Sequence, residues 1–426
     1  MNVKPPGSWV LTTVSSVMLA AAATAGQAEN WPGWRGPTGC GCSDAKNLPL
    51  QWNAKSGENV VWKASLKGTT GHSSPIVWNG SVFLTTATQE TNKEQAAKVV
   101  PQHQLSCYQA SDGKLLWKTA IPPGKVPEGY YIYAVPTPVT DGKAVYAWFG
   151  SAVLVAVDFS GKILWRHEPP GPLRGGISQS PILFQDTVIV CCEQDADLGF
   201  IEALDKTTGK VKWQQRRLKM KHCSATPLLI DVQGKPQLIV AGAELLQALS
   251  PASGEPIWWC KCRADKASPV YSQGLVLVNR GQNGPAVAVD PTGRGDVTAT
   301  HVKWQVAKLP AEFSSALVVG DYVYQVYGDG LLNCVKLSSG EPVYSEQLEK
   351  LSKLPSPFAT ADGRIYLVGS GKSYVIKAGP KLEVLGSGEL HLGMLNGSSP
   401  AVADGRIFVR DFQFLYCLGT AAGSSK

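Results

Sequence analysis

The sequence predicts an all-β protein, an eight-bladed β-propeller, and three observations lead to it. One apolar pattern recurs eight times in the 426 residues, and each copy opens with a small residue that is usually followed by proline. Glycine (44) and proline (29) are abundant and evenly spread, which suits the turns of a chain of short strands. The 44% hydrophobic content is enough for a buried core, and the 17% charged content is too low for a disordered chain.

The first residues read as an export signal. Lys4 provides a positive start, the run from Trp9 to Ala23 is apolar, and Ala28 or Ala25 is suited to the end of a cleavage site. The next cysteine is Cys40, so no lipid-attachment cysteine is expected at the junction. No later apolar run reaches the ~18 residues that span a bilayer. We therefore expect a periplasmic or secreted protein without a transmembrane segment after signal removal.

Four segments result from this interpretation. In chain order they are a signal peptide (1–28), an irregular N-terminal segment (29–58), the propeller (59–420) and a C-terminal tail (421–426).

Each repeat is expected to supply four strands. The repeats open at Ser74, Thr137, Ser180, Thr226, Ser268, Ser315, Ser356 and Ser399. Their fourth strands carry a large residue at Trp117, Trp165, Trp213, Trp258, Trp304, Tyr344 and Leu385.

The eighth repeat ends after its third strand, at Leu415 to Leu418. The segment from Asn59 to Lys63, with Trp62 at its centre, has the pattern of the missing fourth strand. Pairing of the two would close a ring and remove the exposed edges of an open array. A β-helix or an open solenoid is the alternative, and it would need capping repeats, of which the sequence shows none.

A fixed spacing within the repeat supports this fold. Ten positions separate a small residue of the third strand from the large aromatic of the fourth, as in Ala203 and Trp213. The small residue leaves room for the neighbouring sheet, and the aromatic fills the gap between sheets. Cys107, Cys334 and Cys417 stand where other repeats have alanine, so we expect them to be buried free thiols.

The segment from Ala203 to Trp213, ALDKTTGKVKW, resembles the pyrroloquinoline-quinone (PQQ)-like propeller repeat, and Leu249 to Trp258 is similar to it. Eight such repeats in one domain resemble the propeller subunit of the outer-membrane β-barrel assembly machinery, which is a non-enzymatic scaffold. The opening from Trp31 to Pro37 resembles that of many exported quinoprotein-like propellers. The resemblance implies a non-catalytic binding or scaffold protein that presents a channel mouth to a protein or carbohydrate partner in the cell envelope.

The rival function is a PQQ-dependent or other small-molecule oxidoreductase. In the alcohol dehydrogenases of this superfamily, a vicinal cysteine pair forms part of the quinone site, and this chain has Cys191 and Cys192. Adjacent residues of a strand point to opposite faces, which favours one cysteine in the core and one facing out. Glu193, Asp195 and Asp197 offer either a weak cation site or a solvated loop.

We therefore assign no catalytic residue and no metal site, and we expect no cofactor, with PQQ and calcium as the alternative. Whether the protein is an enzyme stays open, with the sequence leaning against it.

Polar residues are predicted to gather at one mouth of the central channel. They lie in the connections that lead into the first strand of each repeat, and such connections surround one end of a propeller. A polar, partly basic funnel there would suit an anionic or sugar-like ligand, or a peptide. The alternative is that these side chains only bind loop backbone. The residues are His72, Tyr131, Arg174, Lys221, His222, Arg263 and His391.

Other features exclude little. The formal charge of +7 is mild, and basic residues do not alternate with aromatics as in a nucleic-acid groove, so we do not expect the protein to bind nucleic acid. We expect the propeller to be a monomer. The Cys-x-Cys pairs at 40–42 and 260–262 leave a bridge or a metal open. The long connection at 87–104 either contacts a partner or is an insertion without a binding role.

Overall fold

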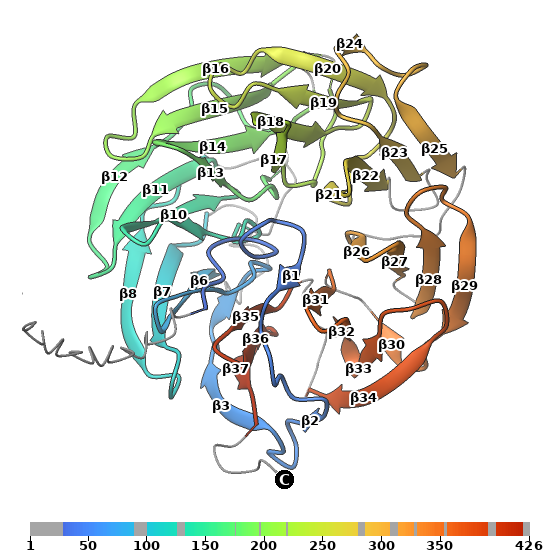
Figure 1. Cartoon of the computed structure of the whole chain (residues 1–426). Helices are drawn as coiled ribbons and strands as arrows, with labels where there is room; N and C mark the ends of the chain where they lie inside the picture. The colour runs from blue at the N-terminus through green and yellow to red at the C-terminus, as the bar shows by residue number, and fades with distance from the viewer. Residues whose placement is uncertain are drawn as a thin grey trace, which may run out of the picture.

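The structure is a computed structural model. It describes residues 29–88, 100–125, 133–174, 176–195, 197–218, 220–279, 286–306, 314–327, 330–352, 356–390 and 398–420. The fold is a β-propeller, and the described strands form eight sheets arranged around a centre (Figure 1). No helix in these ranges is long and apolar enough to cross a membrane.

We number the sheets one to eight in the order of the repeats. Sheet one contains β4 (Thr69–Thr70), β5 (Ile76–Trp78), β6 (Ser81–Thr88), β7 (His103–Gln109) and β8 (Leu115–Ile121). Sheet two contains β9 (Val139–Thr140), β10 (Ala144–Phe149), β11 (Val153–Asp158) and β12 (Ile163–His167). Sheet three contains β13 (Ile182–Phe184), β14 (Thr187–Cys192), β15 (Gly199–Asp205) and β16 (Val211–Arg217). Sheet four contains β17 (Leu228–Val232), β18 (Lys235–Ala241), β19 (Leu245–Leu249), β20 (Pro256–Lys261) and β24 (Gly295–Asp296).

The other four sheets have the same plan. Sheet five contains β21 (Val270–Ser272), β22 (Leu275–Asn279), β23 (Ala286–Val289) and β25 (Val302–Val306). Sheet six contains β26 (Leu317–Val319), β27 (Tyr322–Val326), β28 (Leu331–Lys336) and β29 (Pro342–Gln347). Sheet seven contains β31 (Phe358–Thr360), β32 (Arg364–Leu367), β33 (Ser370–Lys377) and β34 (Glu383–Glu389), joined by β1 (Cys42–Ser43), β2 (Trp52–Asn53) and β30 (Leu351–Ser352). Sheet eight contains β35 (Ala401–Ala403), β36 (Arg406–Arg410), β37 (Phe414–Leu418) and β3 (Val60–Ser65).

Sheet eight takes its outer strand from the other end of the chain. β3 pairs antiparallel with β37, and Trp62 lies opposite Cys417. The strands around Trp62 and Leu418 are therefore neighbours, as the repeat pattern predicts.

In every sheet except sheet seven, the small residue of the third strand lies directly across from the large aromatic. Cys107 faces Trp117 and Ala203 faces Trp213 in the ladders. Cys107, Cys334 and Cys417 are 2%, 0% and 0% exposed and are free thiols, which confirms the expectation for them. The third strands are thus narrow where sheets pack face to face.

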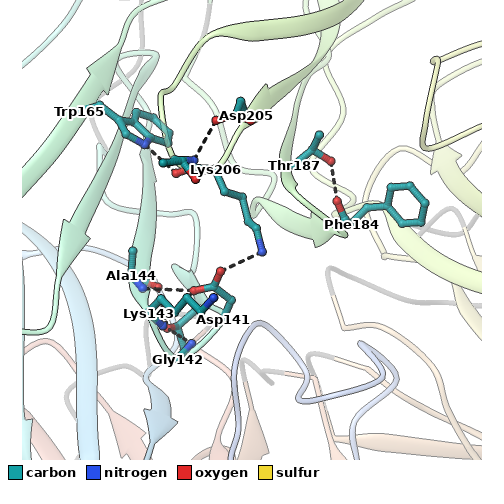
Figure 2. A network of polar contacts seen from close by, with 11 residues as sticks. Asp141, Gly142, Lys143, Ala144, Trp165, Phe184, Thr187, Asp205 and Lys206 are labelled. Carbon is teal, nitrogen blue, oxygen red and sulfur yellow. Dashed lines mark hydrogen bonds and ion pairs between the residues drawn. The ribbon is translucent and has the colours of Figure 1, made fainter.

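The outer aromatics bind the next sheet by one repeated contact. Trp165 of sheet two donates its indole N–H to the carbonyl of Lys206 in sheet three, at 2.8 Å (Figure 2). Its ring lies on Gly209, where an added Cβ would be 2.7 Å from the indole and where φ is +70°. The same indole-to-carbonyl bond joins Trp62 to Ala110, Trp117 to Phe159, Trp213 to Pro251, and Trp304 to Leu337. Lys206 adds an ion pair with Asp141 at 2.8 Å.

Two sheets vary this contact. In sheet four the indole of Trp258 donates to Gln237, whose amide donates in turn to the carbonyl of Pro291 in sheet five. In sheet six the contact passes to Tyr324, whose hydroxyl accepts from the N–H of Gly379 in sheet seven at 2.7 Å. Tyr344, at the aromatic position, is half-buried.

A circuit of hydroxyl hydrogen bonds connects the eight inner strands. The backbone N–H of each repeat's opening residue donates to the side-chain hydroxyl of the next repeat's opening residue, at 2.9 to 3.1 Å. All eight residues are buried. The circuit runs through Ser74, Thr137, Ser180, Thr226, Ser268, Ser315, Ser356 and Ser399, and the N–H of Ser399 donates to Ser74.

The circuit separates two mouths. We call the connection mouth the end where connections enter the inner strands, near residues 71–73, 176–179, 221–225 and 263–267. We call the turn mouth the end where the inner strands turn into the second strands, at turns such as Asn79-Gly80 and Gln233-Gly234.

The N-terminal segment, 29–58, crosses the turn mouth. Its backbone runs in blue over the centre around which the sheets are arranged in Figure 1 and includes β1 and β2. Trp31 pairs with Val77 of sheet one. Arg35 is 2% exposed and donates to the carbonyl of Ala316 in sheet six at 2.9 Å. Burial lowers the pKa of Arg35 to about 10, which leaves it charged at neutral pH. The segment expected to be irregular therefore carries two short strands and contacts inner strands on several sides.

Candidate functional site at the connection mouth

Three of the predicted funnel residues lie together between sheets three and four. The backbone N–H of Arg174 donates to Gln194 at 2.8 Å, and that of His222 donates to the Asp195 carboxylate at 3.1 Å. The Lys221 ammonium is 3.8 Å from the Glu244 carboxylate, and both side chains are largely exposed. Each partner comes from the loop after the second strand of its sheet, because those loops reach the same mouth as the connections. Arg174, Lys221 and His222, with their partners, are called the mouth cluster below.

His222 is held in its neutral form. Its Nε2 is 3.3 Å from the carbonyl oxygen of Gly176. Burial lowers the pKa of His222, and the Gly176 carbonyl, Asp195 and Asp265 oppose this only in part, while Lys266 adds to the lowering. At neutral pH the ring is an uncharged donor, and the positive charge of the cluster comes from Lys221 and Arg174.

The remaining predicted residues are elsewhere or outside the described ranges. His72 packs edge-to-face against Phe412, with ring centroids 5.6 Å apart, on the side of sheets eight and one. Arg263 follows β20 and is exposed. Tyr131 and His391 lie outside the described residues, as do residues 89–99 of the long connection. The sequence therefore places these loops at one mouth, and the structure brings together the subset from two neighbouring sheets.

A buried ion pair underlies the mouth cluster. Arg217 donates to Glu193 at 2.7 Å, and its side chain also donates to Gln247. Both charged side chains are at most 2% exposed. Burial raises the pKa of the Glu193 carboxyl, and Arg217 works against that rise. Glu193 is thus already neutralised by a protein cation and is a poor ligand for a metal ion.

The three acids of the possible cation site do not converge. Glu193 binds Arg217, Asp195 accepts from the N–H of His222, and Asp197 has positive φ in its loop. Within the described ranges, no group of three or more His, Cys, Asp or Glu side chains is placed to hold a metal ion.

The vicinal cysteines point in opposite directions. Cys191 pairs with Ile201 and Cys192 with Phe200 in a regular ladder, so the strand is not kinked between them. Cys191 packs into one apolar cluster, with Ala203 and Leu238, and Cys192 into another, with Tyr146 and Val190. Both cysteines are buried, so the expectation that one of them faces out is wrong: each side of the strand packs against apolar side chains. Burial raises the pKa of both thiols. The pair therefore does not form one side of a shared site.

A buried serine–histidine contact was not singled out from the sequence. His103 Nε2 is 2.6 Å from Ser151 Oγ, and the imidazole stacks on Phe149 with centroids 4.6 Å apart. Both residues are fully buried, and burial lowers the pKa of His103 to about 3. The Nδ1 atom has no hydrogen-bond partner among the described residues. A catalytic dyad needs access to substrate and a group that orients the histidine, so this contact is structural.

Comparison with known proteins identifies the relatives of this fold. A family model described as outer membrane protein assembly factor BamB matches residues 102–235 and, in an overlapping match, 197–348. The structure of BamB from Moraxella catarrhalis is similar, with a TM-score of 0.62 and 16% identity over 86% of this chain and 99% of that one. The computationally designed Ika8 protein has a TM-score of 0.58 and 12% identity over 84% and 99% of the two chains. No curated protein sequence matches.

A quinohemoprotein alcohol dehydrogenase from Comamonas testosteroni is more distant. Its TM-score is 0.44, with 13% identity over 93% of this chain and 82% of that one. At these identities the structural likeness of BamB and Ika8 shows the β-propeller fold alone.

Proposed function

Because this chain belongs to the family described as outer membrane protein assembly factor BamB, we propose that it is an exported, non-catalytic β-propeller that binds a protein of the cell envelope. The observation that carries this proposal is the mouth cluster. Lys221 and Glu244 expose opposite charges beside the Arg174 and His222 loops, and such mixed charge suits a protein surface better than a simple anion. A carbohydrate is the alternative partner, and the test below distinguishes it.

The rigid support is proposed to be a closed ring of eight blades. The β3–β37 ladder supports this, as do the hydrogen bond from Ser399 to Ser74 and the indole bond from Trp62 to Ala110. Each of these contacts joins sheet eight to its own closing strand or to sheet one. Loops on such a scaffold hold their relative positions, which favours binding.

We also propose that the protein works without a quinone. Cys191 and Cys192 face opposite sides of their strand, and Glu193 is paired with Arg217, which supports this proposal. Titration of the purified protein with PQQ and calcium, followed by absorbance and dye reduction, should give no stoichiometric complex and no turnover. A stable quinone spectrum at one equivalent would establish the oxidoreductase instead.

Capture from the native envelope tests the binding function. The tagged protein is cross-linked in intact cells and purified, and bound proteins are identified by mass spectrometry. One envelope protein is expected at near-stoichiometric yield. Lys221→Glu should reduce its recovery about ten-fold, because this change replaces the exposed ammonium of the mouth cluster with a second carboxylate beside that of Glu244. Lys235→Glu, the same change at the exposed start of β18 near the turn mouth, is the matched control and should not alter recovery.

Two outcomes would contradict the proposal. Equal loss with Lys221→Glu and Lys235→Glu would show a general charge effect without a site at the connection mouth. Recovery of glycan without protein, released by free sugar, would establish the carbohydrate alternative.

A further inference from the structure

The N-terminal segment binds the ring by adding backbone to inner strand edges. Trp31 and Val77 of sheet one exchange two backbone hydrogen bonds, at 2.8 and 2.9 Å. The N–H of Thr140 in sheet two donates to the Pro32 carbonyl at 2.9 Å. On the far side, β1 runs parallel to β31 of sheet seven. The inner edges of these sheets are therefore sites where an extended chain is accommodated.

Sheet three offers the same edge, and none of the described residues occupies it. Leu183 holds the position of Val77: each is the middle residue of a three-residue inner strand, and each precedes a two-residue turn. In an antiparallel pair, alternate residues direct their N–H and C=O away from the partner strand, and Val77 uses these groups to bind Trp31. No backbone bond to the equivalent groups of Leu183 occurs within the described ranges. All three residues of β13 are partly exposed.

A cavity of about 260 Å³ lies beside this edge. One wall is the N-terminal segment from Pro32 to Gly39, including Trp34, and the opposite wall includes Ile182 and Leu183 of sheet three and Leu228 of sheet four. Among the described residues, no charged side chain lines it, and the polar lining consists of threonine and backbone. The volume is below that of a typical small-molecule site and suits one or two apolar side chains.

Resting on the proposed binding function, we infer that this cavity is a second contact with the partner and takes an extended, uncharged segment of it as a short strand on Leu183. The segment's backbone would pair with the N–H and C=O of Leu183, as Trp31 pairs with Val77. A large apolar side chain would enter between Trp34 and Leu228. The uncharged lining selects against acidic or basic segments, because burying an unpaired charge is costly. The cavity is continuous with the surface that the chain's own extended segment already occupies, which argues for an extended peptide.

A peptide titration tests the inference. The probe is a capped, fluorescein-labelled pentapeptide, Thr-Val-Leu-Val-Thr, followed by fluorescence anisotropy with the full chain. Binding is expected, and methylation of the central leucine's backbone nitrogen should weaken it at least ten-fold because that change removes one strand bond and keeps the side chains. Equal affinity of the methylated and unmethylated peptides, or no binding at millimolar concentration, would overturn the inference.

A matched pair of proline variants locates the site. Leu183→Pro removes the free N–H and leaves the ladder bonds of its neighbours in β13 in place, because Leu183 does not donate to β14. Val318→Pro makes the same change at the equivalent place in sheet six, away from the cavity. We expect Leu183→Pro to weaken peptide binding at least ten-fold and Val318→Pro to leave it unchanged. Equal loss in both variants would refute the assignment.

Hydrogen exchange of the wild-type protein gives an answer even if Leu183→Pro fails to fold. The amide of Leu183 should exchange at least ten-fold more slowly when the peptide is bound, and unchanged exchange would count against strand pairing. If the protein formed dimers as its concentration rose, and exchange of the Leu183 amide slowed without peptide, the edge would be occupied by a second copy of this chain. That result would overturn the assignment to a partner protein. Envelope capture through Lys221 and this titration fail independently, so a negative result in one does not decide the other.

Discussion

The hydroxyl circuit makes a quantitative prediction at Ser74. Ser74→Ala removes the acceptor of the Ser399 N–H, a bond of 2.9 Å between two residues that are each less than 5% exposed. A buried donor left without a partner costs ~1–3 kcal/mol. Unfolding entropy of ~2.1 cal/mol/K per residue over roughly 360 residues is ~0.8 kcal/mol/K, so the melting temperature should fall by about 1–4 °C.

Differential scanning calorimetry of matched serine variants measures this effect. Ser180→Ala removes an equivalent acceptor, that of the Thr137 N–H, in the middle of the chain, and Ser111→Ala changes an exposed serine outside the circuit. Ser74→Ala and Ser180→Ala should destabilise the protein equally, and Ser111→Ala should melt like the wild type. Suppose that Ser74→Ala had the same melting temperature as Ser111→Ala while Ser180→Ala had a lower one. The hydrogen bond between sheets eight and one would then contribute nothing to stability, and the reasoning for a closed ring would fail.

Three further outcomes follow from contacts elsewhere. Gly209→Ala should cost roughly 2 kcal/mol more in urea unfolding than Gly234→Ala, because both have positive φ but only Gly209 lies against an indole; equal costs would contradict the docking contact. Because the pKa of His103 falls from 6.5 to about 3 on folding, only the unfolded chain binds that proton between these values. Stability should therefore decline below pH 6.5 by up to ~1.4 kcal/mol per pH unit, and less steeply in His103→Phe, as urea midpoints at pH 7 and 5 would show. Thiol reagents should not modify Cys191 or Cys192 before unfolding, because both are buried and burial raises their pKa; labelling of either in the native protein, detected by mass spectrometry, would contradict the buried placement.

The repeated part of the fold was accessible from sequence because each repeat encodes the same contacts. The ten-residue spacing of Ala203 and Trp213 places the two across one ladder, as expected. The opening residues were interpreted only as small. All eight are serine or threonine, and that shared hydroxyl was the available signal for the circuit. A size criterion alone would have admitted alanine, which cannot accept the neighbouring N–H.

Strands outside the repeats could not be predicted from the sequence, because they do not recur at a regular spacing. β2 adds an outer strand to sheet seven, where Gly388 leaves room for Trp52; a Cβ there would be 2.1 Å from the indole. β24 does the same for sheet four. In sheet seven, Val375 pairs with Gly386, one position beyond the expected Leu385. Both this ladder and that of sheet three have a bulge here, but the connection from Ile376 to Val384 is one residue longer than that from Leu204 to Val211. A single glycine or tryptophan in the sequence does not indicate which strand it will pack against.

The mouth cluster shows how far sequence reasoning about a site extends in a repeat protein. Arg174 and His222 were placed at one mouth because both precede an inner strand, yet their proximity depends on adjacent sheets, and His72 is equally positioned in its repeat but packs on Phe412 instead. Each repeat fixes the height of a residue along the channel, while its sheet number fixes the side it faces. A binding surface therefore arises from neighbouring repeats, which explains why the mouth cluster joins sheets three and four and why the free edge at Leu183 belongs to sheet three as well. A partner that reached both mouths of this one sector would contact the two sites without displacing the N-terminal segment from sheets one and seven.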